Sequence, residues 1–88
     1  MMYEMIKKIM NKATEEKVDI GVAQRMLIND GEDNDAMVKA LEIYTKSYED
    51  ISYLYNKGDF DNIKKVVELT EDKKYDEIKE LMKDIKGE

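Results

Sequence analysis

A series of apolar and aromatic residues, spaced four, three, four, three and four positions apart, runs through the middle of the chain. Its members are Met37, Leu41, Tyr44, Tyr48, Ile51 and Tyr55. Alternating steps of three and four residues place side chains on one stripe of an α-helix, and the chain contains no proline to interrupt it. The spacing therefore predicts one long helix over about residues 35–57, about 33 Å in length. Because Ala40, Ile43 and Leu54 form a second row beside the stripe, this helix would contact more than one neighbour.

Two shorter helices are expected before this segment. The first covers Met2 to about Thr14, where the apolar residues at helical spacing are Met2, Ile6, Ile9, Met10 and Ala13. Asp19 can cap a second helix that ends near Asn29, since a side-chain oxygen at that position can accept a hydrogen bond from the first turn. Gly31 suits the left-handed backbone that commonly follows a helix, and Asp33 or Asn34 can cap the long helix.

The segment after Gly58 has two interpretations. Apolar residues at helical spacing extend over residues 60–85, but residues 70–74 are all polar, which predicts a break between two helices. One unbroken helix over 60–85 is the alternative. Residues 59–66 and 74–81 also share an order of aromatic, Asp, any residue, Ile and Lys at an offset of 15 positions. This repeat predicts two similar helix starts, each with an acidic residue at the positive end of the helix dipole.

Residues 54–69, with the sequence LYNKGDFDNIKKVVEL, resemble the central turn of a tetratricopeptide hairpin, in which a Gly, an acidic residue and an aromatic residue join two antiparallel helices. The resemblance implies an antiparallel hairpin here and carries no peptide-binding function. Together these patterns predict an all-α fold, a small antiparallel helical bundle of four to five helices around one long central helix (about 35–57). At 88 residues, the chain is expected to form a single helical domain over 1–88.

The composition disfavours an enzyme. The chain has no Cys and no His, so thiolate nucleophiles, disulfides and the most common zinc ligands are excluded. Adjacent carboxylates such as Glu49 and Asp50 do not face each other on a helix and therefore do not form a catalytic pair. A calcium loop starting at Asp30 would place Asp35 where the loop needs Gly and Leu41 where it needs Glu. We expect no catalytic residue, no cofactor and no metal site.

The apolar residues do not form a membrane segment. No apolar stretch approaches the roughly 20 residues that span a bilayer, and the first twelve residues interleave Lys with apolar side chains. We therefore expect no membrane association and a cytoplasmic location. The size and composition suit a product of a mobile element such as a phage.

The negative charge is concentrated in one part of the chain. Residues 1–28 carry a net charge of +1, residues 29–62 carry −6 and residues 63–88 carry −1. Because the acidic part is also rich in tyrosine, it predicts a surface that binds another protein, of basic character. The candidate partner-binding residues are Glu42, Tyr44, Tyr48, Glu49, Asp50, Tyr53 and Tyr55. The chain would then be a small interaction module, a regulatory protein or an inhibitor.

Other interpretations of the same residues stay open. The acidic face can be ordinary solvated surface over a tyrosine-containing core, or an imitation of a nucleic-acid backbone. The residues of the 37–55 stripe can pack inside the protein, or can form an interface with a second copy in a homodimer or larger homo-oligomer. A helix-turn-helix would join residues 19–29 to a recognition helix starting at Asp33. Direct nucleic-acid binding is disfavoured, since that helix would present Glu32, Asp33 and Asp35 to phosphates.

Overall fold

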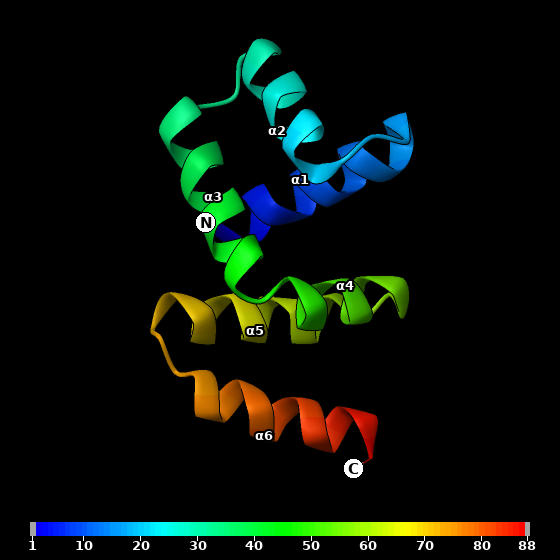
Figure 1. The fold of residues 1–88 in the computed structure, drawn as a ribbon, viewed down its shortest axis with the longest axis vertical. Coiled ribbons are helices and arrows are strands. Elements are labelled where there is room, and N and C mark those ends of the chain that lie inside the picture. Colours follow the sequence, from blue (N-terminus) through cyan, green and yellow to red (C-terminus); the bar gives the residue numbers. More distant parts are fainter. Residues whose placement is uncertain (1, 88) are drawn as a thin grey trace. The chain divides into compact units, whose positions relative to one another are not determined.

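The structure, a computed structural model that describes residues 2–87, contains helices and no strand within this range. The helices in chain order are α1 (Met2–Glu16), α2 (Ile20–Asn29), α3 (Asn34–Lys46), α4 (Tyr48–Asn56), α5 (Phe60–Glu71) and α6 (Tyr75–Lys86) (Figure 1). The all-α prediction is confirmed. The chain divides into two compact units, one ending at Thr45 and the other beginning at Lys46. The prediction of a single domain stays a prediction.

The N-terminal unit contains α1, α2 and α3 up to Thr45. Its buried side chains come from all three helices and are Ile6, Ile9, Met10, Ala23, Gln24, Met37, Ala40 and Ile43. Helix α1 packs against α2. The side-chain amide of Gln24 donates a 3.1 Å hydrogen bond to the carbonyl oxygen of Met37, which joins α2 to α3. The apolar stripe predicted for the first helix thus faces this core.

The turns of this unit follow the predicted capping residues in part. Asp33 caps α3, because its Oδ1 accepts a 3.1 Å hydrogen bond from the backbone N–H of Ala36. Gly31 has a φ of +108°, a backbone angle that favours glycine. Asp19 precedes α2 as predicted, and its carbonyl accepts from the N–H of Ala23, but its side chain makes no capping hydrogen bond.

The prediction of one long central helix over residues 35–57 is wrong. Helix α3 ends at Lys46 and α4 begins at Tyr48, so the described residues form six helices instead of four or five. Ser47 lies between them with φ −133° and ψ 30°, outside the helical region. Its carbonyl oxygen accepts a 3.0 Å hydrogen bond from the N–H of Ile51 and so starts α4.

Two hydroxyl groups make hydrogen bonds at the point where the helix stops. The hydroxyl of Thr45 donates a 2.8 Å hydrogen bond to the carbonyl of Leu41, a bond that commonly bends a helix. The side chain of Ser47 is buried, and its oxygen lies 2.7 Å from the Thr70 hydroxyl oxygen. Spacing in sequence does not reveal the break, because one non-helical residue leaves the three-and-four pattern intact.

The stripe is also less uniformly buried than its spacing predicts. Met37 and Ile51 are fully buried, whereas Leu41, Tyr44 and Tyr55 are half-buried and Tyr48 is 53% exposed. The second row is buried at every position, namely Ala40, Ile43 and Leu54. Because α3 and α4 are separate helices, each has its own buried face. These buried faces do not follow the stripe that was predicted for one continuous helix.

The C-terminal unit contains α4, α5 and α6, which run alternately in opposite directions (Figure 1). Helix α5 packs against both α4 and α6. The buried apolar side chains of this unit are Ile51, Leu54, Ile63, Val66, Val67, Ile78 and Met82. The α4–α5 pair is the antiparallel hairpin that the tetratricopeptide resemblance implies. Gly58 in its turn has a φ of +72°, and the Asp59 carboxylate caps α5 by accepting from the N–H of Asn62 at 3.2 Å.

The predicted break near residues 70–74 is present, because α5 ends at Glu71 and α6 begins at Tyr75. Thr70 nevertheless belongs to α5 and is buried, 2% exposed, with its hydroxyl donating to the Val66 carbonyl at 2.7 Å. Both aromatic residues of the sequence repeat start a helix. Their surroundings differ, since Phe60 packs edge-on against Tyr55 whereas Tyr75 is 45% exposed.

Candidate functional site

The predicted partner-binding residues do not lie on one helix. Glu42 and Tyr44 belong to α3 in the N-terminal unit, and the other five belong to α4 in the C-terminal unit. Those five are Tyr48, Glu49, Asp50, Tyr53 and Tyr55. The predicted surface was placed on one continuous helix over about residues 35–57, so its α4 part has to be considered within its own unit.

The three tyrosines of α4 have different surroundings. The Tyr55 ring packs against Phe60 at 5.8 Å between centroids and an interplanar angle of 86°, so it holds the α4–α5 hairpin together. The Tyr53 ring has the Nζ atoms of Lys57 and Lys86 at 5.0 Å and 4.9 Å from its centroid. Tyr48 is 53% exposed, and its hydroxyl lies 3.5 Å from a carboxylate oxygen of Glu49. Tyr48 is therefore the α4 tyrosine most open to a partner.

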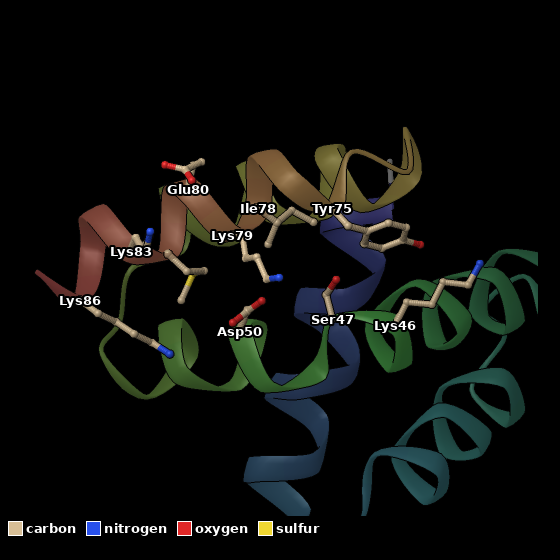
Figure 2. A pocket seen from close by; sticks show the side chains of 10 residues that line it. Lys46, Ser47, Asp50, Tyr75, Ile78, Lys79, Glu80, Lys83 and Lys86 are labelled. Carbon is tan, nitrogen blue, oxygen red and sulfur yellow. The ribbon is translucent and has the colours of Figure 1, made fainter. Parts of the chain in front are cut away.

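A groove of about 500 Å³ lies between the start of α4 and the length of α6 (Figure 2). Lys46, Ser47 and Asp50 line one side of it. Helix α6 contributes Tyr75, Ile78 and Met82, which follow one another at steps of three and four residues and therefore share a helix face. Because α5 packs against both α4 and α6, the two outer helices can leave such a groove between them.

Charged side chains surround these apolar residues. Lys79, Lys83 and Lys86 line the groove from α6 at steps of four and three, together with Glu80. With Lys46 and Asp50 included, the lining contains four lysines and two carboxylates, a net charge of +2 in a chain of net charge −6. The net charge of this groove is thus positive, whereas the net charge of the surface predicted from sequence is negative. Figure 2 shows Asp50 and Lys79 pointing toward each other from the two sides.

Ser47, which lines the groove, forms a buried hydroxyl pair with Thr70 of α5 that serves the fold. The Thr70 hydroxyl uses its single proton on the Val66 carbonyl, so Ser47 must be the donor in the 2.7 Å bond between Ser47 and Thr70. Ser47 thereby ties the start of α4 to α5. Its proton and oxygen are held in this contact, which is structural.

Residues 2–87 contain neither a cluster of metal-ligating side chains nor a helix suited to crossing a membrane. No group of three or more Asp or Glu side chains there lies close enough together to hold a metal ion. None of the helices in that range combines the length and the apolar character that crossing a bilayer requires.

Sequence reasoning missed the α6 side of the groove. The signal was present, because Lys79, Lys83 and Lys86 repeat at helical spacing beside Tyr75, Ile78 and Met82. The net charge of residues 63–88 does not reveal this lysine row. Acidic residues, of which only Glu80 lines the groove, reduce that net charge to −1. Of the predicted residues, Asp50 lines the groove and Tyr53 contacts Lys86 of its lining.

Comparison of the chain with protein-family models, with curated proteins and with solved structures finds no match. No family assignment follows. The chemistry of the groove is the observation from which a function can be proposed.

Proposed function

We propose that this protein is a small, non-enzymatic cytoplasmic protein that binds another protein and thereby regulates or inhibits it. The contact surface is the face of the C-terminal unit that contains α4, α6 and the groove between them. The observation that carries the proposal is the groove itself, in which the exposed Tyr75 ring and a floor of buried Ile78 and Met82 are surrounded by charged side chains. An apolar centre with a polar rim is the usual anatomy of a protein–protein interface.

Each of the two helices carries an exposed aromatic side chain, and Tyr75 lines the groove. Tyr48 on α4 and Tyr75 on α6 are 53% and 45% exposed, and both belong to the C-terminal unit. Tyrosine is enriched at interfaces because it buries a large apolar area while its hydroxyl group still finds a polar partner. We expect these two side chains to account for much of the binding free energy, as buried aromatic residues often do.

The test is affinity capture with the tagged full chain from cells that encode it. The double variant Tyr48→Ala/Tyr75→Ala should lose the captured partner, which mass spectrometry identifies and a titration with the purified partner confirms. Val22→Ala/Val38→Ala is the matched control, because these are the exposed large apolar residues of the N-terminal unit. Equal recovery by the tyrosine variant and the wild type would contradict the proposal.

A second variant examines the acidic residues of the predicted surface. Glu42→Lys/Glu49→Lys reverses two exposed charges, one in each unit. A basic partner would be lost from this variant, whereas a partner that binds in the groove would be retained. The acidic-surface proposal fails if recovery is unchanged.

A further inference from the structure

The lysines of the groove form a stripe beside its apolar residues. On α6, Lys79, Lys83 and Lys86 follow steps of four and three, and Tyr75, Ile78 and Met82 follow steps of three and four. Both series therefore run along the helix axis as parallel rows. Because Ile78 and Met82 are only 3% and 5% exposed and form the floor of the groove, a ligand that lies along α6 would meet the exposed Tyr75 ring and the lysine row.

We propose that this groove binds an acidic amphipathic helix of the partner protein. The apolar side chains of that helix pack on the exposed ring of Tyr75 and on the aliphatic stems of the lysines, over a floor formed by the buried Ile78 and Met82, and its Asp and Glu side chains pair with the lysine ammonium groups. The inference rests on the proposed function and specifies the chemistry of the partner, which is acidic instead of the basic partner predicted from the sequence.

The length of the groove suits a short helix. Residues 75–86 of α6 cover about 16 Å at 1.5 Å per residue, or about three helical turns. A ligand helix of that length presents apolar anchors at positions i, i+3 or i+4, and i+7, which is the spacing used by helices that bind in grooves. The exposed lysines of α6, Lys79, Lys83 and Lys86, have matching steps of four and three residues.

Charge complementarity selects an acidic ligand at this place. The lining has a net charge of +2, although the whole chain carries −6. The attraction is therefore local and short in range, and carboxylates must enter the groove to gain from it. Lys86 is held at one end by the Tyr53 ring, 4.9 Å from its Nζ, with Lys57 on the same ring at 5.0 Å. A carboxylate of the ligand at this end of the groove can pair with the Lys86 ammonium group.

The same features disfavour a nucleic acid. Asp50 and Glu80 in the lining repel phosphates, as does the overall negative charge. The basic side chains of the lining are all lysines, which lack the planar fork with which arginine binds phosphate. A phosphate backbone has no apolar group that could pack on the exposed Tyr75 ring, whereas an amphipathic helix has an apolar face that can.

The experiment uses the full chain labelled with ¹⁵N and three probes. The first is a synthetic helical peptide with Leu at the anchor positions and Glu at the flanking ones. The second has Lys in place of each Glu, and the third is a short DNA duplex. We expect the acidic peptide to shift the amide signals of residues 46–50 and 75–86 in a saturable manner, and to bind more weakly at high salt. The basic peptide and the duplex should leave these signals unchanged.

Charge-reversal variants then locate the interaction. Lys79→Glu/Lys83→Glu changes two exposed groove residues and should weaken the acidic peptide by about tenfold, since each pair at an interface rim changes from attraction to repulsion. Lys64→Glu/Lys65→Glu is the matched control, because it makes the same charge change at exposed positions of α5 outside the groove. The control should alter the affinity by less than about twofold. Circular dichroism of both variants checks that they keep the fold.

Three results would overturn the inference. If the groove variant and the control variant weaken binding of the acidic peptide equally, the effect comes from the overall charge of the protein and not from the groove. If the shifted amide signals lie outside the groove, or if they do not saturate at millimolar acidic peptide, the groove does not bind an acidic helix. Saturable binding of the duplex to residues 75–86 would assign the lysine row to a nucleic acid. If the acidic peptide fails while the tyrosine variant still loses its captured partner, the inference falls and the proposed function stands.

Discussion

Replacing the buried hydroxyl pair of the C-terminal unit should produce unequal and coupled losses of stability. Thr70 is 2% exposed and donates to the Val66 carbonyl, and Ser47 is 7% exposed and donates to the Thr70 oxygen. Thr70→Val keeps the shape of the side chain but removes the acceptor for Ser47. The Ser47 hydroxyl is then buried without a partner, which costs about 2 kcal/mol of the free energy of unfolding.

Ser47→Ala should cost less, about 1 kcal/mol, because Thr70 keeps its hydrogen bond to Val66 and only one bond is lost. The serine side chain makes no capping hydrogen bond to α4, so its removal does not weaken the start of that helix. In the double variant no hydroxyl is left without a partner. Its free energy of unfolding should therefore be no lower than that of Thr70→Val alone, a coupling of about 1 kcal/mol.

Urea unfolding followed by far-ultraviolet circular dichroism measures all four proteins of this cycle. Each variant should have an unchanged dependence on urea concentration, so that the shift of the midpoint reports stability alone. Losses that simply add in the double variant would show that the two hydroxyls do not interact. A Thr70→Val protein as stable as the wild type would refute the reasoning as a whole.

The other predictions concern caps, glycines and the N-terminal unit, and urea midpoints check each of them. Asp59→Ala should cost about 1 kcal/mol, because the N–H of Asn62 loses its capping carboxylate, and Asp59→Asn should restore most of it. Gly58→Ala should cost about 1 kcal/mol, since φ is +72° there, whereas Gly21→Ala in α2, where an added Cβ meets no atom within 4 Å, should gain about 0.5 kcal/mol. The reasoning fails if the two glycine variants change stability in the same direction. Gln24→Leu should cost about 1 kcal/mol through the lost bond to an α3 carbonyl, and an unchanged midpoint would contradict that role.

Much of the helix pattern was predictable from local signals. The start of α5 follows from the capping residue Asp59, and the turn before it from Gly58. The start of α3 follows from Asp33 in the same way. Capping depends on hydrogen bonds between residues three positions apart, so the sequence contains all the participants. The two-helix interpretation of residues 60–85 is also confirmed. Its signal was local too, because a run of polar residues marks the break.

The candidate site was predictable only in part. Asp50 was identified as a surface residue of α4, but its position opposite Lys79 depends on how α4 and α6 pack on α5. The net charge of the segment pointed to an acidic surface, because a sum over residues ignores which face each residue occupies. The net charge of a site can be assigned only when it is known which helix faces meet and which charged residues lie on them.

The sequence by itself determined that this chain is helical, where most helices start and end, and which residues are apolar enough for a core. Periodicity and capping are local, so helices that are separated by capping or polar residues can be identified without knowledge of their neighbours. Only the tertiary structure decided that the chain leaves the helix at Ser47 and that lysines of α6 line a groove with α4. Both depend on contacts between residues far apart in the chain, such as Ser47 with Thr70, and the spacing within one helix does not contain that information.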